Sequence, residues 1–349
     1  MGGVIFAPPF YNFFARDIIN TVRENTWGLI MFEKFRIGVD IGGTNVKIAL
    51  VDKKGEISHP KTVPTRAEMG YEYTISNITQ CIKDLMKEAG IDRSAIEGIG
   101  FGFPGQIDCD NGIVRILPNI PGWIDVPIAE IMQKEFNVPV KVDNDVRCMA
   151  LAELNYGAGA GCKNLICITV GTGIGSGLVI NGKLVRGASN AAGEIGHIKM
   201  EMHDGLICGC GDTGCFEAYA SGPAIVAMAK DYVKGGKSAK FREIAGSTGA
   251  ITPAIVCQAA QEGDVVAKKI FERMGEYLGI GLSSVVNLLN PEKIVIGGGV
   301  ADAGDILFEP LKRTLKDRAM PIQGAAVSVV PAQLGNTAGL IGASLLIDN

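Results

Sequence analysis

Four potential metal ligands gather in one glycine-rich stretch of the sequence. Cys208, Cys210 and Cys215 are separated by glycines and polar residues, and His197 precedes them. Three thiolates and one imidazole form the closed tetrahedral donor set that structural zinc prefers. The spacing therefore predicts a structural Zn²⁺ site, with His203 as an alternative fourth ligand. The other cysteines are expected to be buried reduced thiols: Cys81, Cys109, Cys148, Cys162, Cys167 and Cys257.

Two carboxylates flank this metal loop. Glu194 lies shortly before His197, and Glu217 follows Cys215 closely. Carboxylates that a metal-linked loop holds in place are suited to accept hydrogen bonds from vicinal hydroxyls. The pair therefore indicates a polyol ligand.

Two short glycine turns could hold phosphate groups. Asp40 precedes the turn Gly42-Gly43-Thr44, and a second turn runs Gly171-Thr172-Gly173-Ile174-Gly175. Glycines allow backbone N–H groups to approach an anion, Thr44 adds a hydroxyl donor, and Asp40 could orient hydrated Mg²⁺. Each turn alone is also ordinary hairpin chemistry. Two such turns in one chain favour a triphosphate held from both ends.

A polar run follows a predicted buried strand. Asp143, Asn144 and Asp145 come directly after Val138–Val142, and Val146–Leu154 has a helical pattern. A carboxylate at this strand end could accept a proton from an attacking hydroxyl. Asp and Asn also cap helices well, so the run is typical of a helix N-terminus too. Both roles can hold if one residue caps and another faces the ligand.

The elements around these residues are strands and helices in alternation. Two segments share the order strand, glycine-threonine turn, strand, which predicts two related α/β halves that face each other. Expected strands are Phe35–Ile41, Asn45–Val51, a strand from Ile57, Ile96–Phe103, Val138–Val142, Leu165–Thr169, Ser176–Ile180 and Lys293–Ile296. Expected helices are Tyr71–Ala89, Val146–Leu154 and residues 221–235, 253–262 and 265–289, with a further short helix at Arg16–Asn25.

Composition excludes several classes of protein. A chain of 349 residues, 47% hydrophobic and 20% charged, is expected to form about two globular domains. Its 33 basic and 37 acidic side chains give a net charge of −4, so no overall positive field attracts nucleic acid or anionic lipid. Nine cysteines are too few for a disulfide framework and fit a reducing compartment. We therefore expect a cytoplasmic protein with no nucleic-acid or membrane partner.

Two other nucleotide-binding signatures fail. Residues Gly100 to Gly105 satisfy G-x-G-x-x-G after a strand, but Pro104 and the residues after it open a loop where the dinucleotide fingerprint needs a helix. Gly161 is followed by Cys162 and Lys163, which does not match the ending of a P-loop.

Taken together, the motifs resemble the ROK family of sugar kinases and sugar-responsive repressors, within the actin/hexokinase-like ATPase superfamily. The matching segments are Gly38–Thr44, Gly102–Gly105, Asn144-Asp145, Gly171–Gly175, Glu194 to His197, the cysteine loop through Glu217, and Gly297–Val300. The resemblance implies an α/β fold of two ribonuclease H-like domains with a cleft between them. Residues 35–144 plus 332–349 would form the small N-terminal-type domain, and residues 145–331 the large domain with the zinc loop.

The resemblance also implies roles for single residues. Asp145 is implied to be the catalytic base, and His197 to ligate zinc with Cys208, Cys210 and Cys215. The residues implied to bind sugar are Asn144, Asp145, Glu194, His197, Glu217, Gly105 and Asn119. Those implied to bind ATP with Mg²⁺ are Asp40, Gly42, Gly43, Thr44, Gly171, Thr172, Gly173, Gly175, Gly298 and Gly299, with Gly335-Asn336 near adenine and ribose. A hexose and ATP are the implied ligands, and a dimer or tetramer of identical chains is the implied assembly.

Two details separate this chain within the family. Many relatives have lysine directly after the threonine of the first turn, whereas here Asn45 follows Thr44 and the lysine is Lys47. The segment Pro118–Trp123 resembles the glucokinase version of the substrate loop, so we expect phosphorylation of glucose at the 6-hydroxyl. Trp123 is expected to form an apolar wall that disfavours N-acetylated sugars.

Other activities stay open as alternatives. They are kinases of N-acetylmannosamine, N-acetylglucosamine or fructose, and a sugar-responsive repressor, which would need a DNA-binding helix-turn-helix. Residues 1–34, read as a leader, are too short for that motif. Because Met31 lies just before the first strand, residues 31–349 are expected to suffice for folding and activity.

Overall fold

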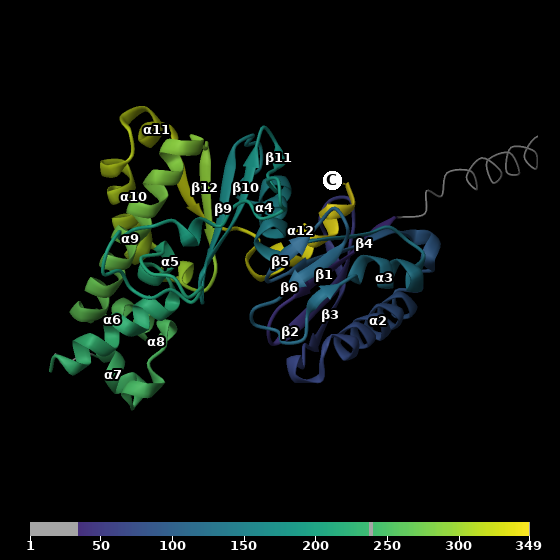
Figure 1. Ribbon diagram of the computed structural model, residues 1–349, viewed down its shortest axis with the longest axis horizontal. Coiled ribbons are helices and arrows are strands. Elements are labelled where there is room, and N and C mark those ends of the chain that lie inside the picture. The colour runs from purple at the N-terminus through teal and green to yellow at the C-terminus, as the bar shows by residue number, and fades with distance from the viewer. Residues whose placement is uncertain (1–33, 237–239, 349) are drawn as a thin grey trace, which may run out of the picture. The chain divides into compact units, whose positions relative to one another are not determined.

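Two five-stranded sheets with the same arrangement of strands organise the fold (Figure 1). The computed structural model describes residues 34–236 and 240–348, so the helix expected at Arg16–Asn25 lies outside the described residues. The first sheet has the order β3-β2-β1-β4-β8 and the second the order β11-β10-β9-β12-β13. Each sheet begins as an antiparallel meander and is extended by two parallel strands. The repeated topology confirms the prediction of two related α/β halves.

Most strand predictions hold. The first sheet consists of β1 (Phe35–Ile41), β2 (Asn45–Val51), β3 (Ile57–Pro64), β4 (Ile96–Phe103) and β8 (Val140–Asn144). The second consists of β9 (Leu165–Val170), β10 (Ile174–Ile180), β11 (Lys183–Leu184), β12 (Lys293–Gly297) and β13 (Ser328–Pro331). Strand β8 starts later than expected because Pro139 has no N–H to donate to a ladder. Strand β10 starts earlier than expected, so Gly175 lies in a strand and not in the turn.

A third, small sheet was not expected. It is antiparallel and consists of β5 (Gln106–Asp108), β6 (Ile113–Ile116) and β7 (Ile124–Val126). It directly follows β4, in the stretch that was interpreted as a loop.

Helices cover the sheets and link them. They are α2 (Tyr71–Glu88), α3 (Ile128–Phe136), α4 (Asp145–Tyr156), α5 (Phe216–Tyr219), α6 (Gly222–Lys234), α7 (Lys240–Ala245), α8 (Pro253–Gln261), α9 (Val265–Leu289), α10 (Asp305–Arg318), α11 (Pro321–Ala326) and α12 (Ala338–Leu345). The expected helices at α2, α4, α6, α8 and α9 are confirmed. Within the described part of the chain, no helix is both long and apolar enough to cross a bilayer.

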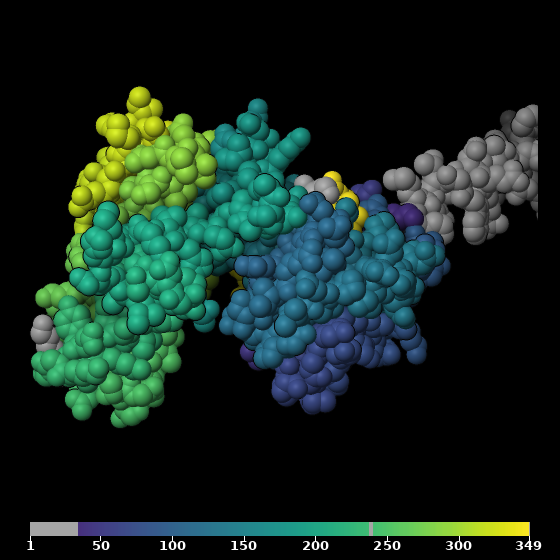
Figure 2. All heavy atoms as spheres, viewed as in Figure 1, coloured from purple at the N-terminus to yellow at the C-terminus, as the bar shows by residue number. Residues whose placement is uncertain are grey.

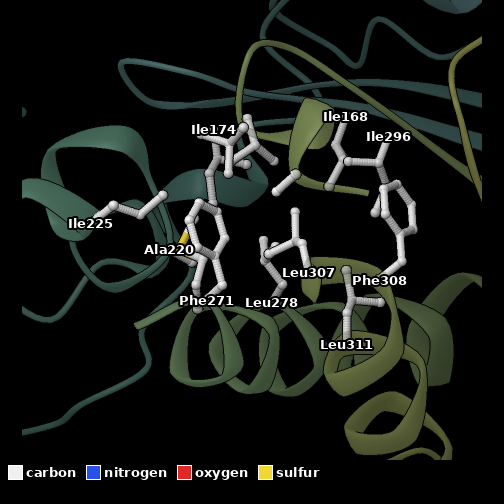
Figure 3. Packing of buried hydrophobic residues seen from close by; sticks show 14 of the residues in the cluster. Ile168, Ile174, Ala220, Ile225, Phe271, Leu278, Ile296, Leu307, Phe308 and Leu311 are labelled. Atoms are coloured by element: carbon white, nitrogen blue, oxygen red, sulfur yellow. The ribbon is translucent and has the colours of Figure 1, made fainter. Parts of the chain in front are cut away.

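The largest hydrophobic core lies on the second sheet. Figure 3 shows Phe271 and Leu278 of α9 with Phe308 of α10 packed below Ile168 and Ile296 of the strands. These side chains are at most 3% exposed, and burying each one contributes roughly 1.5–3 kcal/mol. A separate core fills the first sheet against α2 and α3. In Figure 2 the purple and blue segments gather in one group and the green segments in another, with the yellow C-terminal end of the chain beside the blue group.

Helices α4 and α12 connect the two sheets. Helix α12 packs on β1, β4 and α4, and α4 also packs on β9 and β10. The backbones come so close that a Cβ added at Gly342 would overlap the carbonyl oxygen of Cys148. A Cβ at Gly38 or Gly100 would likewise overlap carbonyl oxygens of α12. None of the three glycines has a positive φ, so backbone conformation does not require glycine there. Glycine is required because no other side chain would fit between the backbones.

We expect Gly342→Ala to lower the free energy of unfolding by about 3 kcal/mol or more, because the added methyl must push α12 away from α4. Gly249→Ala is the matched control. Gly249 is exposed, and a Cβ added there would come no closer than 4.0 Å to the Ser247 hydroxyl, so the effect should stay within about 0.5 kcal/mol. Urea unfolding followed by circular dichroism measures both. Equal midpoints for the two variants would contradict the close crossing.

Candidate active site and metal centre

The three polar residues at the junction between β8 and α4 have three different environments. Asn144 caps α4, since its Oδ1 accepts from the amides of Val146 at 3.0 Å and Arg147 at 3.3 Å. Asp143 is fully buried, and Asp145 lines a cavity. The helix-cap interpretation is confirmed for Asn144, and the ligand-facing role of Asp145 stays a prediction.

That cavity has a volume of about 370 Å³ and takes residues from both sheets. Asp40 ends β1, Asp145 begins α4, and Gly298 and Gly299 follow β12. Gly335 and Asn336, just before α12, line it as well. The other residues expected to bind ligands are not part of its lining: Gly42, Gly43, Thr44, Gly105, Asn119, Asn144, Gly171, Thr172, Gly173, Gly175, Glu194, His197 and Glu217.

The two carboxyl groups in this cavity are electrostatically coupled. Burial first, and then the negative charge of Asp40, together raise the pKa of Asp145 to about 7. Burial also raises the pKa of Asp40, which the Lys47 ammonium partly offsets from 3.9 Å. A carboxyl with a pKa near neutrality can exchange a proton with a bound ligand at physiological pH. Lys47 reaches the same cavity and donates to the carbonyl of Asn336 at 2.9 Å.

The glycine turns expose bare backbone. A Cβ added at Gly43, Gly171 or Gly299 would meet no atom within 4 Å. Gly298 has a φ of 87°, and a Cβ there would lie 2.5 Å from the Val170 carbonyl, so this position requires glycine. By contrast, Gly175 faces α4, because its Cβ would meet Val146 at 2.7 Å.

A second cavity, of about 730 Å³, lies beside the second turn. Gly171, Thr172 and Gly299 line it together with apolar side chains of α6, α8 and their surroundings. These include Val226, Ile251, Pro253 and Val300. No sequence motif marked them, because apolar residues on a helix are indistinguishable from core residues until their packing is known.

The predicted metal ligands come together. The donor atoms of His197, Cys208, Cys210 and Cys215 all lie within 4.8 Å of one another. Cys210 Sγ lies 3.9 Å from Cys215 Sγ, and Cys208 Sγ lies 3.7 Å from His197 Nδ1. Two Zn–S bonds of about 2.3 Å at a tetrahedral angle place sulfurs about 3.8 Å apart, so the set fits zinc. His203, the alternative ligand, is not in this cluster.

Neighbouring side chains support the metal loop. Lys199 Nζ donates to Cys215 Sγ at 3.2 Å and to Asp212 at 2.5 Å, so it contacts one predicted ligand from outside the donor set. All nine cysteines lie within the described residues, and none forms a disulfide.

Glu217 links the metal loop to the second glycine turn. Its Oε1 lies 3.0 Å from Cys208 Sγ, and its Oε2 accepts from the amide of Ile174 at 3.2 Å. Glu194 precedes His197 and is exposed. Asn144 Nδ2 lies 3.4 Å from the carbonyl of Gly105, which brings these two predicted residues together. Asn119 is exposed in the turn before β7 and stays a prediction as a ligand residue.

Trp123 is not the exposed apolar wall that was expected. It is 1% exposed and packs against Phe103 and Tyr71, with ring centroids 5.3 and 6.0 Å away. The aromatic side chain joins the core of the first sheet because β4 and α2 supply aromatic partners there. Because its ring is buried in this core, it does not form a wall against a ligand.

The sequence model of the ROK family matches residues 36–349 of this chain. The chain belongs to the ROK family. It is 38% identical to a glucokinase of Halalkalibacterium halodurans over 91% of this chain and 96% of that protein. A xylose repressor of Caldicellulosiruptor bescii is 32% identical over 89% of this chain and 77% of its own length. A ROK glucokinase of Streptomyces griseus, solved in complex with glucose and AMPPNP, superposes with a TM-score of 0.76 at 35% identity, covering 89% of this chain and 98% of that one. ROK kinases and ROK repressors thus align at similar identity.

We expect the purified protein to hold one zinc ion per chain and Cys210→Ser to lose it, because the weaker hydroxyl ligand breaks the tetrahedral set. Metal analysis by mass spectrometry gives the ratio. Cys257→Ser, which lies in α8 outside the cluster, should retain zinc. Protein that contains no zinc after purification without chelators would dismiss the site.

Proposed function

We propose that this chain transfers the γ-phosphoryl group of ATP to the 6-hydroxyl of glucose. The observation that carries the proposal is the cavity at the β8–α4 junction, where Asp145 lies beside Asp40 and the glycines after β12. Membership of the ROK family and the similarity to glucokinases support it.

Asp145 is proposed as the catalytic base. With a pKa raised to about 7, its carboxylate is a stronger base than an ordinary aspartate and is still largely ionised at slightly alkaline pH. The carboxylate would accept the proton of the sugar hydroxyl while that oxygen bonds to the γ-phosphorus and the bond to ADP breaks. Most of the remaining work is positioning and charge stabilisation.

The phosphate side of the site has matching chemistry. The open backbone at Gly43, Gly171 and Gly299 can approach phosphate oxygens, and Asp40 would hold Mg²⁺, which neutralises phosphate charge when bound. Thr44, Thr172 and the other turn glycines named above are proposed to complete these contacts, except Gly175, which faces α4. Lys47 supplies a cation in the same cavity, although it does not directly follow Thr44.

The apolar second cavity is proposed to hold the adenine ring. It opens beside Gly171 and Gly299, and its side chains Val226, Ile251 and Val300 offer the apolar faces between which a purine can stack. Gly335 and Asn336 line the first cavity, together with Asp145. We therefore propose that they lie near the phosphates, whereas the resemblance implied a place near adenine and ribose.

The sugar side is proposed to use Asn144, Glu194, His197 and Glu217, with Gly105 and Asn119 from the first sheet's loops. The link from Glu217 to the second turn supports this, since it places a carboxylate between the metal loop and the phosphate side. The preference for glucose rests on the similarity to glucokinases alone, because the buried Trp123 gives no reason to reject an N-acetyl group. A cytoplasmic homo-oligomer remains part of the proposal.

We expect the purified chain to phosphorylate glucose faster than mannose, fructose, N-acetylglucosamine or N-acetylmannosamine at saturating ATP. A coupled assay that detects ADP measures all five. Faster turnover of another sugar would refute the glucokinase assignment but keep the kinase. If no sugar is phosphorylated and a sugar changes binding to operator DNA, the repressor alternative replaces it.

We expect Asp145→Asn to fold and bind glucose but to lose roughly 10²- to 10⁴-fold in kcat, because the amide cannot accept the hydroxyl proton. The wild-type kcat/KM for glucose should rise with pH through about 7, since Asp145 must be ionised to act as a base. Calorimetric titration with glucose confirms that the variant still binds. Near-normal turnover, or activity that falls as pH rises from 6 to 8, would exclude Asp145 as the base.

A further inference from the structure

Asp143 is a fully buried carboxylate that the proposed reaction does not use. Its Oδ1 forms an ion pair with Arg147 Nε at 2.8 Å and accepts from the amide of Asn144 at 2.7 Å, and its Oδ2 accepts from Arg186 Nε at 2.8 Å. A buried charge is costly unless it is paired and hydrogen-bonded, and Asp143 has both kinds of partner. Two guanidinium groups on one carboxylate exceed what neutralising Asp143 requires.

The second guanidinium comes from a different part of the fold. Arg186 follows β11 and begins the irregular segment 186–193, which leads to Glu194 and His197. Asn190 makes two further contacts from this segment. Its carbonyl accepts from Arg147 Nη1 at 2.8 Å. Its side-chain Nδ2 donates to Asp110, which follows strand β5 of the small sheet, at 3.0 Å. In Figure 2 the teal surface of this region meets the blue surface of the first sheet's loops.

We propose that Arg186 is a positioning residue that holds segment 186–193 against the β8–α4 junction and so preorganises Glu194 for the sugar. The inference rests on the proposed function, because Glu194 is assigned to the sugar there. The segment has no helix or strand of its own. Its two ends are joined by the Ala192 amide, which donates to the Arg186 carbonyl at 2.9 Å, and Ser176 Oγ donates to the carbonyl of Gly193. The contacts with Asp143 and Arg147 join it to the β8–α4 junction. A segment that is ordered before binding does not lose that entropy when the sugar binds. These contacts should therefore raise the affinity for the sugar, and they should change neither the affinity for the nucleotide nor the rate of proton transfer.

Arg186→Gln tests this without unfolding the protein. Asp143 keeps Arg147 and the Asn144 amide, and Arg186 is itself 29% exposed. We expect about a tenfold higher KM for glucose, with kcat within about twofold and KM for ATP unchanged. Arg186→Lys should recover part of the loss, because an ammonium can still pair with Asp143. Amide hydrogen exchange in segment 186–193 should become faster in Arg186→Gln than in wild type.

Arg313→Gln is the matched control. Arg313 of α10 pairs with Glu272 of α9, is 58% exposed, and makes none of the contacts described for segment 186–193. It should change neither KM nor exchange. An unchanged glucose KM in Arg186→Gln, or an equal rise in Arg313→Gln, would overturn the positioning role while wild-type glucose phosphorylation upholds the proposed function. If the wild type phosphorylates no sugar, the proposed function fails. In that case amide hydrogen exchange still tests the segment, because equal exchange rates in wild type and Arg186→Gln would overturn its positioning by Arg186.

Discussion

Direct backbone contact between helices α4 and α12 sets the distance between the two sheets. Gly342 of α12 meets the carbonyl of Cys148 in α4, and on its other side α12 rests on the glycines of β1 and β4. Helix α4 in turn lies on the second sheet, where Gly177 leaves room for Ala150. Any side chain at these crossings would move one sheet relative to the other. The position of Asp145, in the first turn of α4, relative to Asp40, at the end of β1, is a consequence of this packing.

The same packing determines the charges in the site. Asp40 lies against Gly339 of α12, where a Cβ would come within 2.9 Å of its carboxyl carbon, so α12 removes water from that carboxylate. Asp145 shares the cavity and responds to both burial and the charge of Asp40 with a raised pKa. The chain that enters α12 is held by Glu153, a buried carboxylate of α4 that accepts from the amides of Gln333 and Leu334. Helix α4 thus supplies Asp145, the proposed base, in its first turn and anchors the chain that enters α12 near its opposite end.

The sequence was most informative where the signal is local. The hairpin β1–β2 and the metal cluster were predictable because turn glycines and ligand spacing need no knowledge of distant residues. Strands β5 to β7 are too short to show alternation, and α12 is apolar on almost every side, so it shows no helical period. The pair of Asp143 and Arg186 is separated by 43 residues and has no motif. Trp123 was misjudged because its aromatic partners come from strand and helix positions that only the folded chain brings together.

The two sides of the candidate site are held in place by different means. On the phosphate side, the turns are ends of hydrogen-bonded strands, so the sheets themselves fix the backbone groups that would face an anion. On the proposed sugar side, residues from Arg186 to Cys215 form almost no regular structure, and their backbone pairing is limited to the isolated bridges Lys199–Cys215 and Ile207–Thr213. The candidate metal cluster lies at one end of this stretch and the buried Asp143 ion group at the other. Ordering such a long stretch costs much conformational entropy, which metal–thiolate bonds and buried charge pairs can offset locally. A zinc ion at the cluster, if bound as we expect, and the Asp143 group would then order the two ends of the same stretch.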